Sequence, residues 1–320
     1  MLEYLIRRLL LIVVTVIGVT MVIFALLRVV PGDAATAALG DEGAGVGLTE
    51  ETRAEIRRHL GLDEPLVAQY GIWIWNLVRL DPGDSFVTGE PITQEIRHAI
   101  PITLQLAVMS FIIATVLALT SGVLSALKQD TWVDYLFRIL AAGGLAMPGF
   151  WLGILTIVAL SLWFDYVPFA RYKPFFNDPW GNLQQFFFPA LILGCRSAAV
   201  MARMVRSSML EVLKQEYITT AWAKGLRQWV VIGRHAIKNA AIPVVTLGGF
   251  QVAGLLGGVV VVERVFNLPG TGTFMINALL SRDYYMVQTL VTLFALVVIF
   301  SNFLVDMMYA WLDPRVRYRS

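Results

Sequence analysis

Long runs without a charged residue or histidine divide this chain. Five runs are clear, and they cover residues 9–27, 99–127, 139–164, 239–262 and 284–305. A helix needs roughly 20 apolar residues to cross the hydrocarbon core of a bilayer, so each run predicts one membrane-spanning helix. Two arginines precede the first run, as in a signal peptide, but the run is too long for the apolar part of one and no small-residue cleavage site follows it closely. We interpret it as a retained span.

A sixth span is predicted at residues 186–206, which are apolar apart from arginines that include Arg196 and Arg203. An arginine near the middle of a span costs on the order of 3 kcal/mol unless it reaches the interface or faces protein or water. Cytoplasmic segments are usually rich in Lys and Arg. Six spans with a cytoplasmic N-terminus put 15 of these residues inside and nine outside. Without this span the most basic segment would lie outside, so we expect six spans with both termini in the cytoplasm.

The first large segment between spans, residues 31–98, is acidic, with 12 Asp or Glu and five Lys or Arg. Thr49 and Gly61 have the residue types that begin and end a helix, and a second helix is predicted from Pro65. This segment is expected outside the cytoplasm. Two roles remain open for it, a lid packed on the outer ends of the spans or a docking surface for an extracytoplasmic partner.

The second large segment, residues 207–238, is basic and is expected inside. Residues 208–211 have the Ser-x-x-Glu pattern of a helix N-terminus, Gly225 is expected to end that helix, and an amphipathic stretch follows. A basic helix beside a membrane is often a surface helix attracted to anionic lipid. The alternative is a projecting helix that inserts into a cytoplasmic protein.

The composition agrees with a membrane protein: 57% of the residues are hydrophobic, 15% are charged and the mean hydropathy is +0.68. A soluble domain carries about 25% charged residues, so a soluble enzyme, a disordered chain and a nucleic-acid module are excluded. The net charge of +2 is too small to suggest a polyanionic partner. Cys195 is the single cysteine, which excludes an internal disulfide and a cysteine metal site.

Motifs for enzymatic chemistry are missing. The phosphate-binding loop G-x-x-x-x-G-K-[ST] does not occur, so ATP hydrolysis by that route is not expected. Residues 270–272, Gly-Thr-Gly, are interpreted as a turn after Pro269. The three histidines are far apart in the sequence, and the uncharged runs hold no carboxylate that would couple transport to an ion gradient. Asp306, near the inner end of the last span, is interpreted as a capping or pairing residue.

Several neutral residues inside the spans have possible roles in transport. Glutamine is harder to satisfy than a hydroxyl by bonding to its own helix, and Pro148 frees a backbone carbonyl and predicts a kink. The candidates for a translocation path are therefore Gln105, Pro148, Gln251 and Asn302. Gly254 and Gly258 form a G-x-x-x-G pattern that suits close helix packing, either within this chain or against a second membrane subunit.

Seven short motifs occur in an order that is familiar. They are YLIRR at residues 4–8, VPGD at 30–33, LGLDEPLVAQY at 60–70, EYITTAWAKG at 216–225, VERVFNLPG at 262–270, RDY at 282–284 and LDPRVR at 312–317. With these motifs the chain resembles, over nearly its whole length, the permease subunits of dipeptide and oligopeptide ABC importers.

The resemblance implies an all-α integral membrane protein with the type I ABC importer permease fold and six transmembrane helices. Its parts would be an N-terminal tail and first span (1–30), an extracytoplasmic helical domain (31–98), a permease core (99–312) and a cytoplasmic tail (313–320). The core would hold spans at 99–127, 139–164, 186–206, 239–262 and 284–312, with a coupling loop at 207–238. A chain of this kind passes short peptides across the cytoplasmic membrane.

The resemblance also implies partners: a second, related permease subunit in a heterodimer, two cytoplasmic ABC ATPase subunits and an extracytoplasmic substrate-binding protein. ATP and Mg²⁺ would be used by the ATPase subunits, and this chain would bind no cofactor and no nucleic acid. The so-called EAA loop of such permeases places a coupling helix in a groove of the ATPase. It maps here to Tyr217, Thr219, Thr220, Ala221, Ala223, Lys224, Gly225 and Leu226, with Thr219 where the general motif has Glu.

Other functions remain as alternatives. An ion-coupled secondary transporter would use a proton or sodium gradient in place of ATP, and a non-transporting assembly subunit would show no uptake. Within the same permease class, relatives handle nickel complexes, glutathione or sugars, and nothing in the sequence distinguishes these substrates from peptides.

Overall fold

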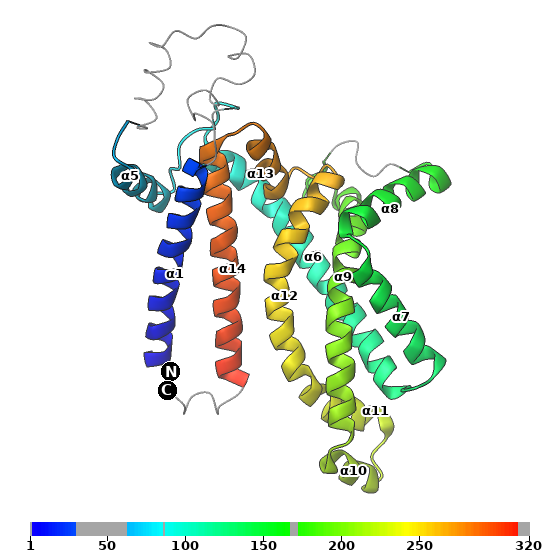
Figure 1. Ribbon diagram of the computed structural model, residues 1–320. Helices are drawn as coiled ribbons and strands as arrows, with labels where there is room; N and C mark the ends of the chain where they lie inside the picture. Colours follow the sequence, from blue (N-terminus) through cyan, green and yellow to red (C-terminus); the bar gives the residue numbers. More distant parts are fainter. Residues whose placement is uncertain (1, 30–62, 86, 167–171, 313–320) are drawn as a thin grey trace. The chain divides into compact units, whose positions relative to one another are not determined.

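The computed structural model describes residues 2–29, 63–85, 87–166 and 172–312, and these residues are helical apart from turns, connectors and one isolated β-bridge between Asp84 and Pro91 (Figure 1). The helix expected at residues 49–61 and the motif at 30–33 lie outside the described residues. The chain divides into two compact units. The first comprises residues 1–103 and 269–300, and the second comprises residues 104–268 and 301–320.

Four helices of the described chain are long and apolar enough to cross a membrane, and the number rises to six if each of two bent helix pairs is one span. The four are α1 (Leu2–Val29), α6 (Ile92–Leu127), α9 (Pro179–Leu213) and α14 (Tyr284–Leu312). The helices α6 and α9 extend beyond the ranges 99–127 and 186–206 that the apolar runs define. Polar residues continue these helices because a helix satisfies its own backbone hydrogen bonds in water as well as in lipid.

In the first unit, α5 (Leu66–Val78) packs on the end of α1 through three aromatic rings. Phe24 of α1 lies 5.4 Å from the ring of Tyr70 and 6.1 Å from that of Trp73, measured between centroids. The Tyr70 hydroxyl forms a 2.9 Å hydrogen bond with the Thr20 hydroxyl, and Arg28 donates to the Gln69 side chain at 2.7 Å. The helix predicted from Pro65 is confirmed: Pro65 is its N-cap residue.

The first unit also contains α13 (Thr271–Leu280), which the sequence pattern did not predict. The Gly-Thr-Gly motif is not a turn: Gly270 is the N-cap of α13, and the next two residues are helical. Two contacts fix this helix. Thr103 of α6 and Thr271 form a 2.9 Å hydrogen bond, and Ala278 packs in a buried cluster with Ile92 and Leu290. Ten residues between two turn-forming sequences are too few for a clear helical period, which explains the omission.

In the second unit, α9 is the central helix, with α12 (Lys238–Val265) and α7 (Trp132–Ala146) packed against it (Figure 1). Of the most apolar 18-residue window of α9, 61% is buried, against 33% or less in the other three long helices. Small residues permit this packing. A Cβ atom added at Gly122 of α6 would lie 2.6 Å from Cβ of Val205, and one added at Gly194 would lie 2.8 Å from Cγ2 of Ile113.

The third apolar run, 139–164, is not one helix. It is divided between α7 and α8 (Gly149–Phe164), which meet at an angle of 102°. The expected effect of Pro148 is therefore larger than a kink. A proline disfavours the helical conformation for the residue before it, and Met147 is extended, with φ −95° and ψ 133°. Pro148 is itself extended and serves as the N-cap of α8.

The segment at 207–238 differs from its prediction at one end and agrees at the other. The expected helix start at residues 208–211 is wrong, because α9 continues through them to Leu213. A separate short helix, α10 (Glu216–Ala223), follows, and its end beside Gly225 is confirmed. The chain then forms α11 (Gln228–Val230) and the π-helix η1 (Val231–Ile237), which continues into α12.

Candidate functional site

The first candidate site is formed by residues 216–226, named here the α10 segment, which projects beyond the end of α9 in Figure 1. Ile218 and Ala221 lie on its inner face and have 1% and 6% of their surface exposed. They pack with Met209 of α9 and with Val231 and Ala236 of η1 in one buried cluster. The inner face therefore holds the α10 segment against its own chain.

Gly225 ends the helix α10 with a Schellman motif. Its φ of +72° is in the left-handed region, where glycine has no steric penalty. The amide of Gly225 donates to the carbonyl of Trp222 at 2.9 Å, and the amide of Leu226 donates to the carbonyl of Ala221 at 3.4 Å. These are the two hydrogen bonds of the motif, and they reverse the chain immediately after the helix.

The outer face of the α10 segment is exposed and partly apolar. Tyr217, Trp222 and Leu226 have 42%, 43% and 37% of their surface exposed. The Asn239 side chain of α12 donates to the Tyr217 hydroxyl at 2.9 Å and so ties the segment to the start of the long helix. The other predicted coupling residues are exposed as well, apart from the buried Ala221: Thr219, Thr220, Ala223, Lys224 and Gly225.

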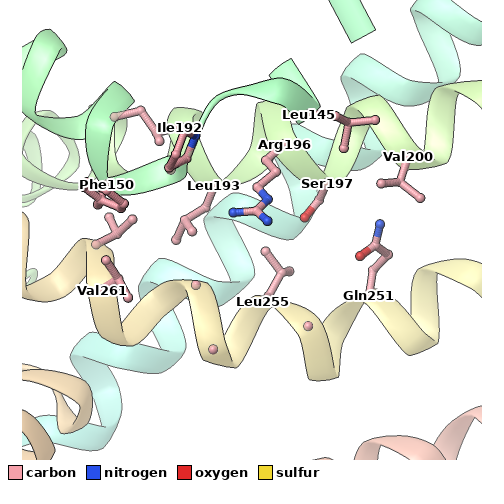
Figure 2. Close-up of a pocket in the computed structure, with 16 residues that line it drawn as sticks. Leu145, Phe150, Ile192, Leu193, Arg196, Ser197, Val200, Gln251, Leu255 and Val261 are labelled. Carbon is pink, nitrogen blue, oxygen red and sulfur yellow. The ribbon is translucent and has the colours of Figure 1, made fainter. Parts of the chain in front are cut away.

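The second candidate site is a cavity of about 620 Å³ inside the second unit. It lies between the start of α8, the middle of α9 and the middle of α12 (Figure 2). Its polar side chains are Arg196, Ser197 and Gln251, and apolar side chains and backbone form the rest of its wall. A volume of 300 to 1,000 Å³ is usual for sites that hold small molecules, so this cavity is large enough for one.

The structure brings together two of the four predicted path residues, since Pro148 and Gln251 both line the cavity. Gln105 lies elsewhere and donates a hydrogen bond to the side chain of the buried Asn182. Asn182 in turn donates to the carbonyl of Lys173 at 2.8 Å. Asn302 lies on α14, and its buried Oδ1 has no hydrogen-bond partner among the described residues.

The two glycines of the G-x-x-x-G pattern also line the cavity, but they differ in their contacts. A Cβ atom on Gly258 would lie 2.9 Å from Cδ2 of Leu193 in α9, so this glycine permits close packing within the chain. At Gly254 the nearest atom would be Oε1 of Gln251, at 3.7 Å. That position is open.

Two features of the second unit were not found from the sequence. Arg196 was recognised as costly for a span, but not as a residue of a cavity. The buried ion pair between Asp134 and Arg206 was also missed, although it connects α7 to α9 at 2.7 Å. The high cost of a charge in lipid was the available signal for Arg196. Asp134 lies between two predicted spans, where a charged residue is ordinary, so the sequence holds no comparable signal for the ion pair.

An exposed ion pair lies at the start of α9. The Asp178 carboxylate accepts from Lys173 Nζ at 2.7 Å and from the amide of Gly181 at 2.8 Å, where it caps the helix. The Lys173 hydrogen bond, with the amide as a second cause, holds the pKa of Asp178 below its ordinary value. Burial raises the pKa of the neighbouring Tyr172. These groups fix the connector in front of α9.

Comparison with known families identifies the chain. Residues 118–318 match the family model described as binding-protein-dependent transport system inner membrane component, and residues 1–107 match the model of its N-terminal part. The chain belongs to this family. It is therefore an ABC permease of the inner membrane, and such subunits are not enzymes. A binding-protein-dependent system implies a binding protein and ATPase subunits as partners.

Relatives of this permease extend over its whole length. The dipeptide transport system permease protein DppB of Escherichia coli is 37% identical and that of Alkalihalophilus pseudofirmus 36%, with 99% or more of each chain covered. The glutathione transport system permease protein GsiC of Pectobacterium atrosepticum is 39% identical over all of both chains. Among solved structures, the crystal structure of an amino acid ABC transporter with histidines is 13% identical with a TM-score of 0.50. The match covers 68% of this chain and 93% of that one, and it shows the fold alone.

Proposed function

We propose that this permease passes short peptides, received from a substrate-binding protein, across the inner membrane while separate ATPase subunits hydrolyse ATP. The observation that carries the proposal is the full-length identity of 36–37% with two dipeptide permeases. The glutathione permease, at 39%, makes glutathione the second candidate substrate. Both candidate substrates are small peptides, so they belong to the same chemical class.

The α10 segment is the proposed coupling helix. Its inner face is anchored in the buried cluster through Ile218 and Ala221, so a force applied to it reaches α9 and η1 directly. Its outer face offers Tyr217 and Trp222 to a partner, and aromatic residues are common at the centre of interfaces. The residues proposed to enter the ATPase groove, or to shape the helix that enters it, are the predicted set. Ala221 belongs to the second kind, because it is the small buried residue that allows the helix to pack against its own chain.

The proposed assembly contains this chain, a second, related permease, two ABC ATPases and the binding protein. In it, this chain has the type I permease fold, with six spans and both termini in the cytoplasm. In that orientation α5 belongs to the extracytoplasmic domain (31–98), as a lid or a docking surface for the binding protein. Each bent helix pair would count as one span, which agrees with the distribution of basic residues.

The cavity, with Pro148 and Gln251 in its wall, is the best supported part of the proposed path. Asn302 remains a proposed path residue, supported by its unpaired buried oxygen. Gln105 has weaker support because its side chain is already engaged with Asn182. Gly254, whose surroundings are open, is the better supported of the two glycines for contact with the second permease, since Leu193 occupies the space at Gly258.

The test is reconstitution in proteoliposomes. The complete complex, with its partner permease, ATPases and binding protein, is expected to accumulate a labelled dipeptide only when ATP is present on the cytoplasmic side. Each omission of one component is expected to abolish uptake. Uptake by this chain alone, driven by a proton or sodium gradient, would refute the proposal, and so would a complete complex that hydrolyses ATP without moving any peptide from a broad panel.

A further inference from the structure

Arg196 carries its charge at a position where a charged side chain is unfavourable. It lies in the middle of α9 (Pro179–Leu213), one of the four helices long and apolar enough to span the membrane. An arginine at such a position makes insertion of the helix into a membrane costly. The side chain is exposed within this chain, and it forms no ion pair or hydrogen bond with any residue of the described ranges. Packing within the chain therefore does not explain it.

Arg196 lines the cavity of the second unit. Figure 2 shows its guanidinium group extending from α9 towards α12, in the space framed by Leu193, Ser197 and Leu255. It is the one charged side chain in the wall, which holds no carboxylate. Gln251 points into the same space from α12. A single fixed positive charge with apolar walls and two neutral polar groups favours a ligand that has one anionic group and a neutral remainder.

The chemistry of arginine indicates which anionic group the ligand carries. Its planar guanidinium presents two parallel N–H donors that match the two oxygens of a carboxylate. A short peptide ends in such a carboxylate, and its amide groups can hydrogen bond to glutamine and serine side chains. A charge–charge contact is also stronger beside apolar walls than in bulk solvent.

We propose that Arg196 binds the C-terminal carboxylate of the peptide during its passage, with Gln251 and Ser197 as hydrogen-bond partners of its backbone. The inference rests on the proposed function and adds a site of selection to it, separate from the binding protein. Peptides with a free C-terminus are then preferred by the permease itself. A peptide whose terminus is an amide loses this contact and passes more slowly.

The first test measures uptake by the complete complex in proteoliposomes for one dipeptide with a free C-terminus and for its C-terminal amide. The affinity of the binding protein for each form is measured separately and divided out. Arg196→Met is expected to lower uptake of the free acid about tenfold or more, the usual size of a hydrogen bond to a charged group. Uptake of the amide should change little. Arg203→Met, the control, alters the same residue type on the same helix outside the cavity wall and should leave the ratio of the two rates unchanged.

A second measurement does not depend on transport of the amide. In a Cys195→Ser background, Val200→Cys places a single thiol in the cavity wall. An anionic sulfonate thiol reagent should modify it faster than a neutral reagent, and Arg196→Met should remove that preference. Millimolar free-acid peptide should slow the modification, whereas the amide should not.

Three results would overturn the inference. One is an equal loss of both peptides in Arg196→Met, which indicates a structural role or an ion pair with the partner permease. Another is an Arg196 effect that appears with phosphatidylglycerol and vanishes in pure phosphatidylcholine, which indicates a lipid phosphate. The third is uptake of the free acid by Arg196→Met at the wild-type rate. Failure of the proposed function itself is distinct, because the wild-type complex would then take up neither peptide.

Discussion

Arg206 of α9 binds Asp134 of α7 through both carboxylate oxygens, with Nε 2.9 Å from Oδ1 and Nη2 2.7 Å from Oδ2. Asp134 has no exposed surface, and Ser125 at the end of α6 donates to the same carboxylate. The backbone amide of Asp130 adds a fourth donor at 3.1 Å. One buried carboxylate therefore joins three helices of the second unit.

Loss of the Asp134 charge should destabilise the permease. Breaking a buried ion pair costs about 3–5 kcal/mol when one partner remains. Arg206 is 22% exposed and can reach water, so we expect the lower end of that range, about 3 kcal/mol, for Asp134→Ala. The measurement is the midpoint of thermal unfolding of the purified complex in detergent. Asp178→Asn, which breaks an exposed ion pair, is the control and should have little effect.

A double variant separates the ion pair from the packing of its residues. Asp134→Asn with Arg206→Met removes both charges and should cost less than the sum of the two single variants, because neither charge is then left buried without a partner. Additive losses in the same unfolding experiment would show that the pair does not couple α7 to α9.

Gly122 should not accept even a methyl group. Its position lies against Val205 and the carbonyl of Ala202, and a Cβ atom would be 2.6 and 2.8 Å from these neighbours. Overpacking of this kind costs about 1–3 kcal/mol, so Gly122→Ala should lower the unfolding midpoint and the yield of folded permease. Gly143→Ala in α7 is the matched control, with no atom within 4 Å of the new methyl group. It should be neutral or slightly stabilising, because alanine favours a helix. Equal behaviour of the two variants would contradict close packing of α6 on α9.

Pro148 should maintain the bend between α7 and α8. Pro148→Ala removes the restriction on Met147 and restores an N–H donor, so part of the population should form a longer helix across the break. Spin labels at positions 140 and 160 would then lie about 30 Å apart, the length of 20 helical residues, whereas the 102° bend holds them closer. Pro101→Ala is the control, since α6 already continues through Pro101. An unchanged distance distribution would mean that packing alone sets the bend.

Some of this architecture follows from the sequence because one energy term dominates it. Charges are so costly in lipid that uncharged runs locate the long helices, and α14 begins at Tyr284, the first residue of its run. Gly225 was identifiable as a helix end because few other residues adopt a positive φ without cost. Pro148 marked the position of the bend for a similar reason.

Other features depend on contacts between distant residues. The proline does not determine an angle of 102°, which also depends on the packing of α7 and α8 against α9 and α12. Asp134 and Arg206 are 72 residues apart and meet only after α7 packs on α9. The inward position of Ala221 and the place of Arg196 in a cavity wall likewise depend on which faces of their helices pack. Hydrophobic periodicity is weak in helices that are apolar on every side, so these faces are not evident from the sequence.

Gly225 provides a test of coupling that does not disturb the core. Its φ is +72° and no atom lies within 4 Å of the place of a Cβ, so a substitution meets backbone strain alone. A β-branched residue is strongly disfavoured in this conformation, whereas asparagine adopts it more readily. Gly225→Val should distort the turn that orients Trp222 and Leu226, and Gly225→Asn should keep it. In proteoliposomes holding the complete complex, we expect Gly225→Val to lower the number of peptides moved per ATP hydrolysed, or to prevent retention of the ATPases. Gly225→Asn should stay near wild type. If both variants moved peptide with wild-type stoichiometry, the α10 segment would not be the element that receives force from the ATPase.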